Sequence, residues 1–255
     1  MLSTLKTPQQ ISGAIIKSVV PASNDKSRIY TVSVTPCTAM KFEARRDSMT
    51  RKGISDIDTV LTVRELARLI VLYGIDITNI DPEPADEPMA LRSSSSLLAE
   101  SAGGITESVL RSLAARMGEK DAEKPALKKL RNTVSFRETM VTAGGESFSV
   151  AVVDGLKGLT RIRQMIEGGA KYDLIEVMAC PGGCVNGGGM LPAGSKEAVK
   201  QRSRFIWQTD DQEAVRGPEQ SAAVADLYGR VFEQCTELAD KKLFHTHFSK
   251  RDILL

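Results

Sequence analysis

The chain has 255 residues, of which 42% are hydrophobic and 26% charged, the balance of an ordinary globular protein. Its formal net charge of +2 gives no argument for binding to nucleic acid or to an anionic membrane. No segment reaches the roughly 18 consecutive apolar residues of a membrane-spanning helix, and residues 1–10 resemble neither a signal peptide nor a transit peptide. We therefore expect no membrane span, no nucleic-acid partner and a reducing, intracellular compartment.

The first half of the chain predicts a strand, a helix and a long polar connection. RIYTVSVTP (28–36) is β-branched and alternating, which is typical of a strand, and it leads into a loop that carries Cys37. TVRELARLIVLYG (62–74) places apolar residues at helical spacing and ends at a glycine. The stretch 76–96 is rich in Pro, Asp and Ser and predicts a loop at a boundary between two lobes.

The second half predicts helices that alternate with strands. Residues 103–118 predict a helix, 147–156 a strand, 159–169 a short helix, and 172–180 a nearly all-apolar strand. A strand, a helix and a strand at this spacing indicate a βαβ unit, and hence a parallel sheet covered by helices. A last amphipathic helix is predicted from about Pro218 to Leu243.

Three of the four cysteines gather near predicted strand ends. Cys37 and Cys180 each lie just past a strand, at the sheet edge where ligands bind in open α/β folds. Cys184 follows four residues later, and glycines on both sides let the backbone approach a large group. Such thiolates suit an iron–sulfur cluster, which generally takes four cysteines, better than they suit zinc. Cys235 is expected to be a packing residue on the apolar stripe of the last helix.

Two segments resemble signature motifs of the [FeFe]-hydrogenases. PCTAMKFEARR (36–46) is similar to the second signature of that family, and EVMACPGGCVNGGG (176–189) to the third. Further similar segments follow the family's order and extend the resemblance over nearly the whole chain: residues 2–17, 56–70 and 102–113, then LYGRVFEQ and LFHTHF.

The resemblance implies an α/β, two-lobed iron-hydrogenase-like fold, with twisted, mostly parallel sheets flanked by helices and the N-terminal part of the first lobe missing. It divides the chain into a large-subunit-like domain, 1–200, and a small-subunit-like helical segment, 201–255. The implied activity is reversible reduction of protons to H2, with electrons from ferredoxin or another iron–sulfur carrier. The implied location is the cytoplasm, or the matrix of an anaerobic organelle in a eukaryote.

The resemblance also implies a cofactor and site residues. The family's H-cluster joins a [4Fe–4S] cluster to a two-iron subcluster through one cysteine sulfur. By motif position, Cys37 and Cys180 would ligate the [4Fe–4S] cluster, and Cys184 would bridge the two parts. The other implied residues are Pro8, Gln9 and Met178 beside the two-iron subcluster, Ser3 in the proton path, and Glu43 in the place of a glutamate that pairs near the site; Ser3 and Glu43 are the implied catalytic residues.

The chain departs from the family pattern in ways that favour a retained [4Fe–4S] cluster over the complete H-cluster. The first signature, TSC-x-P-x-W, which carries the fourth cysteine ligand, is absent. Thr35, Met40 and Met190 stand where the family has methionine, lysine and glutamine, and methionine cannot donate the lysine's hydrogen bond. We also expect an unpaired sheet edge in the first lobe, and a separate chain that supplies the missing motif.

Three functional readings stay open. The first is a hydrogenase catalytic domain, and the second is a non-catalytic iron–sulfur protein. The latter could be a sensor or a relative of the cytosolic iron–sulfur assembly factors, which share MACP-x-GC-x-NGGG. The third is a diverged α/β protein without a cluster. His245 and His247 are expected to cap or pack, while Lys128–Lys129 and Arg45–Arg46 are solvated faces or a docking patch for acidic ferredoxin.

Overall fold

The computed structural model describes residues 2–19, 29–86, 93–119, 127–234 and 243–249. The chain divides into two compact units. The first unit combines Met1–Pro88 with Asp226–Leu255, and the second unit is Met89–Ala225. The division between them falls inside the polar stretch 76–96, where the composition predicts a lobe boundary. The separate division at residue 200, between large- and small-subunit-like segments, stays a prediction.

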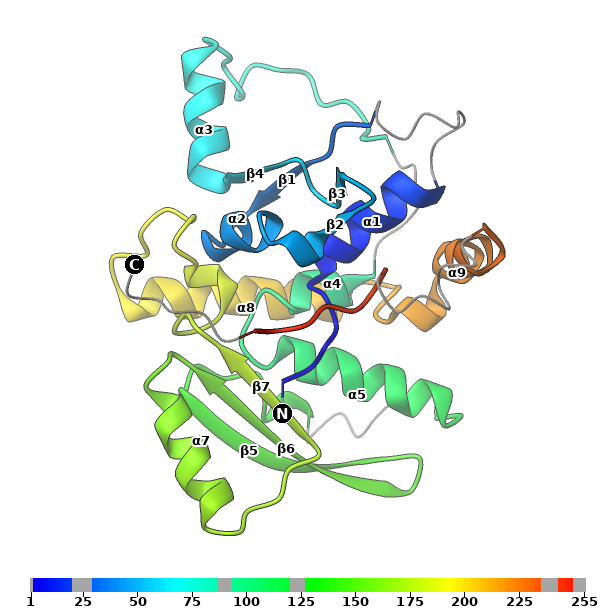
Figure 1. Ribbon diagram of the computed structural model, residues 1–255. Coiled ribbons are helices and arrows are strands. Elements are labelled where there is room, and N and C mark those ends of the chain that lie inside the picture. Colours follow the sequence, from blue (N-terminus) through cyan, green and yellow to red (C-terminus); the bar gives the residue numbers. More distant parts are fainter. Residues whose placement is uncertain (1, 20–28, 87–92, 120–126, 235–242, 250–255) are drawn as a thin grey trace. The chain divides into compact units, whose positions relative to one another are not determined.

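The first unit contains two small sheets and several helices. β1 and β4 form a two-stranded parallel sheet in which Val34 pairs with Leu61, and β2 pairs with β3 in an antiparallel hairpin. Within the described residues β1 and β4 each have one neighbouring strand, so the expected open sheet edge is present. The elements, visible in Figure 1, are α1 (Pro8–Val19), β1 (Val32–Thr35), α2 (Ala39–Ala44), η2 (Asp47–Met49), β2 (Thr50–Arg51), β3 (Ile54–Ser55), β4 (Thr59–Thr62), α3 (Val63–Leu72) and most of α9 (Ala222–Gln234).

Two ion pairs fasten α1 and the residues just before it to the β3–β4 connection. Lys6 Nζ lies 2.7 Å from Asp56 Oδ2, and the side chains of both residues are almost completely buried. Lys17 Nζ lies 2.6 Å from Asp58 Oδ2. Between these pairs the backbones touch, because a Cβ atom on Gly13 would lie 2.1 Å from the Asp56 carbonyl oxygen. A glycine in mid-helix is therefore required by this close approach.

The two ends of the sequence meet within the first unit. An antiparallel bridge joins Leu5 to His245, and Thr4 Oγ1 lies 2.8 Å from His245 Nδ1. Arg46, which follows α2, donates a hydrogen bond of 2.6 Å to the carbonyl oxygen of His247. The LFHTHF segment thus contacts residues near the start of the chain, and the side chain of His245 is hydrogen-bonded to Thr4.

The second unit is built on a three-stranded sheet in the order β5–β6–β7. β6 and β7 are parallel and connected by α7, so the predicted βαβ unit is confirmed. β5 adds an antiparallel hairpin that was not predicted. The elements are α4 (Ser94–Leu98), α5 (Gly104–Arg116), β5 (Phe136–Ala143), β6 (Glu146–Asp154), α7 (Gly158–Glu167), β7 (Leu174–Met178), η3 (Cys184–Asn186), α8 (Lys196–Gln212) and η4 (Pro218–Gln220).

Helices cover both faces of this sheet, as Figure 1 shows for α5 and α7. Val150 and Val152 of β6 pack in a cluster with Leu110 of α5, while Val153 packs with Ile162 of α7. All of these side chains are at most 5% exposed, as expected of a central strand. The predicted α/β class, with helices flanking the sheets, is confirmed. Among the described helices, none has the length and apolar character needed to cross a membrane.

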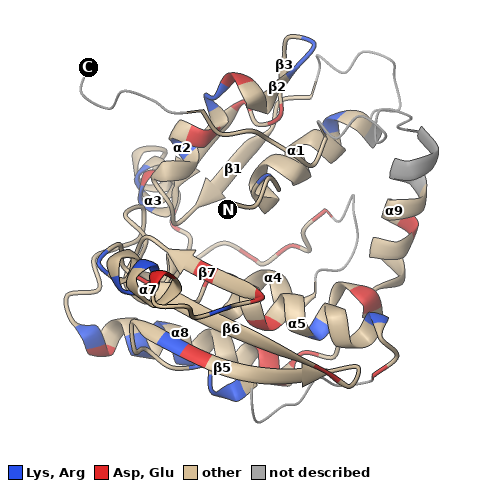
Figure 2. Ribbon diagram, turned by 60° about the horizontal axis from the view of Figure 1, so that its bottom comes forward, with Lys and Arg blue, Asp and Glu red and all other residues tan. Residues whose placement is uncertain are grey.

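A buried cluster of charges joins α5 to α8 in the second unit. Asp210 of α8 is fully buried and accepts hydrogen bonds from Arg111 (2.8 Å), Arg216 (2.8 Å) and Arg131. Arg131 also donates to Glu107 of α5 at 2.9 Å. Burial acts to raise the pKa of Asp210, but its hydrogen bonds with arginines outweigh this and hold it well below the ordinary value. Figure 2 shows basic and acidic positions interspersed on α5 and α8.

Candidate metal centre

Cys180 and Cys184 lie on a tight loop that follows β7, here called the cysteine loop (residues 179–187). Gly182 and Gly183 have φ angles of +83° and +93°, a region that favours glycine. Gly183 N donates to the Cys180 carbonyl at 3.0 Å, and Gly187 N donates to the Cys184 carbonyl at 2.8 Å. The two cysteines are therefore separated by tight turns rather than by a helical turn, and both are half-buried.

Backbone contacts hold the cysteine loop against the connection between α4 and α5. Val185 N donates to the Glu100 carbonyl at 3.1 Å, and Ala102 N donates to the Gly182 carbonyl at 3.2 Å. A Cβ atom on Gly183 would lie 2.6 Å from Ala102 N, closer than real Cβ atoms come to other atoms. The backbones touch directly, so this part of the signature motif is glycine for a steric reason.

An apolar wall and an arginine complete the surroundings of the loop. Met178 is buried in the same apolar cluster against which Cys184 packs. Arg202 of α8 donates to the carbonyl oxygens of Val185 and Leu191, both at 3.0 Å, and so fixes the segment that follows the cysteines. The loop is thus held from the strand before it, the α4–α5 connection and the helix after it.

Glu100 is a neighbour of Cys184 that the sequence analysis missed. Burial raises the pKa of Glu100 above its ordinary value, while the hydrogen bond with Cys184 acts in the opposite direction. Its Oε2 atom is buried and has no hydrogen-bond partner among the described residues. The one signal in the sequence is an acidic residue beside the small residues of SAGG, which does not reveal its contact with a residue 84 positions away (184 − 100).

Cys37 lies in the first unit, between β1 and α2. Thr35 Oγ1 accepts a hydrogen bond from Cys37 N at 3.2 Å, a local turn that threonine supports. Gln9 Oε1 accepts from Ser33 Oγ at 2.7 Å, and Gln9 Nε2 lies 3.5 Å from the Met40 carbonyl. Gln9 therefore contacts the elements on either side of Cys37.

Ser3, expected in the proton path, and Glu43, expected to pair near the site, have different neighbours. Glu43 Oε2 accepts a hydrogen bond of 2.6 Å from Thr7 Oγ1. Burial raises the pKa of Glu43, although the Thr7 hydrogen bond opposes the shift. Ser3 is exposed, and its Oγ accepts from Leu5 N at 3.3 Å. Pro8 is exposed and begins α1. The observed polar neighbour of Glu43 is thus Thr7.

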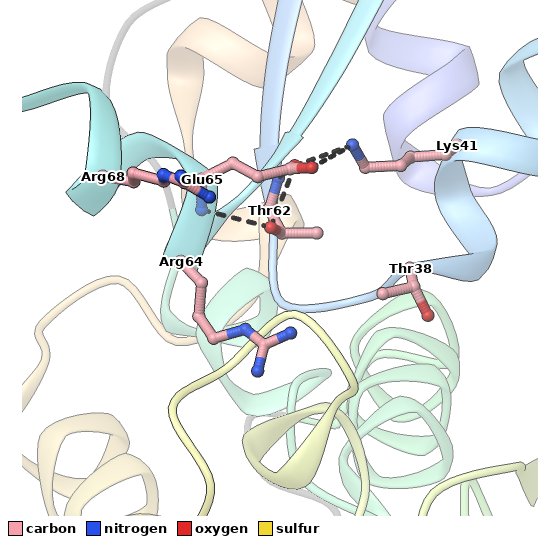
Figure 3. Close-up of a pocket in the computed structure, with 6 residues that line it drawn as sticks. All are labelled: Thr38, Lys41, Thr62, Arg64, Glu65 and Arg68. Carbon is pink, nitrogen blue, oxygen red and sulfur yellow. Dashed lines mark hydrogen bonds and ion pairs between the residues drawn. The ribbon is translucent and has the colours of Figure 1, made fainter. Parts of the chain in front are cut away.

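A polar cavity of about 410 Å³ lies beside α3 (Figure 3). Glu65 accepts from Lys41 Nζ at 2.8 Å and, in a capping box, from Thr62 N at 2.8 Å. Figure 3 shows Arg64 and Thr38 pointing away from the Lys41–Glu65 pair, so the cations do not converge on one point. The ammonium of Lys41 is engaged by Glu65. The lining residues are Thr38, Lys41, Thr62, Arg64, Glu65 and Arg68.

The Glu65 capping box is expected to weaken in acid. Hydrogen bonds from Lys41 and Thr62 lower the pKa of Glu65 from 4.5 to about 2. A carboxyl group whose pKa is lowered by folding stabilises the fold at a pH above its pKa in the unfolded chain. This contribution is lost as the pH falls from 4.5 towards 2. Hydrogen exchange measured by mass spectrometry, corrected for intrinsic rates, should show α3 opening more at about pH 3 than at about pH 6. The variant Glu65→Gln should lack this pH dependence, and an equal dependence in both proteins would contradict the assignment.

The three cysteines fit a soft metal cluster by their chemistry. None of Cys37, Cys180 and Cys184 forms a disulfide, and all three are half-buried. Thiolate sulfur is the donor that iron–sulfur clusters take. Within the described residues, three or more His, Cys, Asp or Glu side chains do not gather as a metal site. Cys37 belongs to the first unit and the other two to the second, while Cys235 lies outside the described residues.

Comparison with known protein families shows to which family the chain belongs. Residues 1–188 match the iron only hydrogenase large subunit, C-terminal domain, and residues 196–251 match the iron hydrogenase small subunit. The chain belongs to the iron hydrogenase family. Iron hydrogenase 1 of Clostridium pasteurianum is 32% identical over 257 residues, which cover 98% of this chain and 45% of that protein. The cytosolic Fe-S cluster assembly factor narfl of Xenopus tropicalis is 29% identical over 264 residues, with 97% and 53% covered.

A solved structure confirms that this member of the iron hydrogenase family has the fold that the resemblance implied. A variant of the [FeFe]-hydrogenase HydA1 from Chlamydomonas reinhardtii matches with a TM-score of 0.73 and 25% identity, over 96% of this chain and 70% of that chain. The chain spans about half the length of the curated relatives cited above. Its relatives in the family thus include both hydrogenases and cluster assembly factors.

Proposed function

We propose that this chain is an iron–sulfur protein that binds a [4Fe–4S] cluster through Cys37, Cys180 and Cys184. The observation that carries the proposal is the cysteine loop, where two half-buried cysteines sit on backbone that admits no side chain at Gly183. The family match over residues 1–188 includes both cysteine motifs and adds support. When bound, such a cluster supplies one-electron transfer.

The fourth ligand and the electron partner are part of the proposal. A [4Fe–4S] cluster generally takes four cysteines, and we assign three, so a polypeptide outside residues 1–255 would supply the motif with the fourth. Electrons would come from ferredoxin or another iron–sulfur carrier. Lys128 and Lys129 are exposed and suit an acidic partner. Arg46 suits it less, because its guanidinium is engaged by the carbonyl of His247.

For the completed assembly, we propose reversible reduction of protons to H2. Glu43 would hold a proton on its carboxyl group, and the raised pKa of this half-buried residue supports that role. Thr7, whose hydroxyl donates to Glu43, would connect it to the segment that carries Ser3. Pro8, Gln9 and Met178 would line the side of a two-iron subcluster, if the chain binds one.

A non-catalytic iron–sulfur function is the second candidate. Met40 brings no hydrogen-bond donor to the place where the family resemblance expects a lysine. Lys41 is engaged by Glu65, which argues against its acting as a substitute. The similarity to the assembly factor narfl agrees with this alternative. In this case the chain would keep the [4Fe–4S] cluster and lack the two-iron subcluster.

Anaerobic reconstitution with iron and sulfide tests the proposed cluster. The expected result is about four iron atoms per assembled protein and an electron paramagnetic resonance signal after reduction. Replacing Cys37, Cys180 or Cys184 by serine should lower the iron content sharply, whereas Cys235→Ser is the matched control and should not. The proposal would be overturned if the protein took up no iron, or if Cys235→Ser lost as much iron as the other three variants. Hydrogen evolution after addition of a synthetic diiron complex would decide for catalysis, and a cluster signal without hydrogen for the second candidate.

A further inference from the structure

The carboxylate of Glu176, in strand β7, is bound to the start of α5. It is buried, and its Oε1 accepts a hydrogen bond from Gly103 N at 2.7 Å. Its Oε2 accepts from Thr106 N and Thr106 Oγ1, both at 2.8 Å. Glu176 therefore satisfies three donors at the N-terminus of a helix of 13 residues. It lies four residues before Cys180, on the strand that leads into the cysteine loop.

The α5 helix depends on this carboxylate because it has no cap of its own. The N-cap residue is Gly103, with a φ of +91° and no side chain to accept a hydrogen bond. A negative charge at a helix N-terminus is also favoured by the helix dipole. Arg137 belongs to β5, which β6 separates from β7. Its Nη2 would lie 3.6 Å from a Cβ atom added to Gly103, and its Nη1 pairs with Asp154 at 3.2 Å. Glu176 thus acts as a cap supplied by a different element.

The same start of α5 holds the cysteine loop. The residues immediately before Gly103 bind the loop at both of its turns: Ala102 to Gly182, and Glu100 to Val185. The contacts therefore close a ring, which runs from Glu176 along β7, through the cysteine loop, across the α4–α5 connection and back to Glu176. The cysteine loop is held in one backbone shape because it is fixed at both of its turns. Loss of one set of hydrogen bonds in the ring weakens the others.

We propose that Glu176 is a positioning residue, which fixes the backbone of Cys180 and Cys184 by holding the start of α5 against β7. The inference rests on the proposed function in one respect, which is that the shape of the cysteine loop serves to bind a cluster. The contacts that carry it belong to the protein alone. Glu176 would act through the α4–α5 connection, without touching the cofactor.

Alkylation of the cysteines in the cluster-free, full-length chain tests the inference. Under anaerobic conditions, rates of reaction with iodoacetamide are measured for each cysteine by peptide mass spectrometry. Removing hydrogen bonds to a charged acceptor in Glu176→Ala should raise the rates of Cys180 and Cys184 by about tenfold. In Glu176→Gln one oxygen remains as an acceptor, so the increase should be smaller. Cys37, in the first unit, is the internal reference, and its rate should stay unchanged.

Two control variants separate positioning from simple loss of stability. Asp173→Asn alters a carboxylate that accepts Ser149 N at 2.7 Å beside the opposite end of β7, and should leave all three rates unchanged. Ile162→Ala weakens the second unit from the other face of the sheet. If Ile162→Ala, adjusted by denaturant to the same stability as Glu176→Ala, raises the rates of Cys180 and Cys184 equally, the inference is overturned. An unchanged rate in Glu176→Ala overturns it as well.

The cluster-loaded protein supplies a second, spectroscopic readout. In Glu176→Gln, the reduced protein should show shifted g values relative to wild type, while Asp173→Asn should reproduce the wild-type signal. An identical signal in Glu176→Gln would count against positioning of the cluster ligands. If wild type takes up no iron, the proposed function fails, and the alkylation rates still decide whether Glu176 shapes the loop.

Discussion

Replacing Asp210 by alanine is expected to lower the free energy of unfolding of the second unit by about 3–5 kcal/mol. The carboxylate is fully buried and accepts hydrogen bonds from Arg111, Arg131 and Arg216. Its removal leaves partly buried guanidinium groups without enough acidic partners, which costs more than the ion pairs themselves contribute. Because the pKa of Asp210 is lowered, its contribution should persist in mild acid and be lost only as the pH falls through that low value.

The fluorescence of Trp207 measures this effect. It is the one tryptophan of the chain and lies on α8, three residues before Asp210, so it reports urea unfolding of the second unit. The matched control is Asp211→Ala. Asp211 also pairs with Arg131 and Arg216, but its side chain is 48% exposed. Such an exposed pair should contribute less than about 1 kcal/mol. An equal decrease in the free energy of unfolding in the two variants would show that burial of Asp210 does not cause the destabilisation.

Replacing Gly183 by alanine is expected to abolish iron binding by the cysteine loop. At a φ of +93° and a ψ of −162° an alanine is strained by about 1–3 kcal/mol. The new Cβ would also lie 2.6 Å from Ala102 N and 2.9 Å from the Ser101 carbonyl carbon. Both are backbone atoms, so the loop must leave the α4–α5 connection to relieve the contact. The iron content after reconstitution should fall to that of a Cys180→Ser variant.

Gly169→Ala is the control for an alanine placed at a positive φ without a close contact. Gly169 also has a φ of +93°, but a Cβ atom added there would meet no described atom within 4 Å, and the residue lies between α7 and β7. This variant should keep its iron. Loss of iron in Gly169→Ala, or retention of iron in Gly183→Ala, would show that close backbone packing does not shape the cysteine loop.

Helices and strands whose apolar residues recur with a clear helical or strand period were predictable from the sequence. The β6–α7–β7 unit follows from two apolar strands and an amphipathic helix, and α3 and α5 follow from their helical spacing. β5 was missed because FRETMVTA alternates charged and apolar residues weakly. Its turn signal, Gly144–Gly145, with φ angles of +60° and +79°, was present but unused.

The candidate site was predictable only where a motif carries it. The three cysteines stand in signature segments, whereas the roles of Glu100 and Glu176 depend on contacts with residues far along the chain. Glu176 meets Gly103 across 73 positions, and no local pattern encodes that distance. Glu43 was expected to pair near the site, and its hydrogen-bond partner Thr7, 36 positions away, could not be named from the sequence.

The meeting of Thr4 with His245 has a consequence for the order of assembly during synthesis. These residues are 241 positions apart, whereas the second unit is a continuous stretch of chain. As the polypeptide leaves the ribosome from its N-terminus, the second unit can therefore condense while translation continues. The first unit is completed only when LFHTHF has been made, so Thr4 and Leu5 gain their partner His245 late.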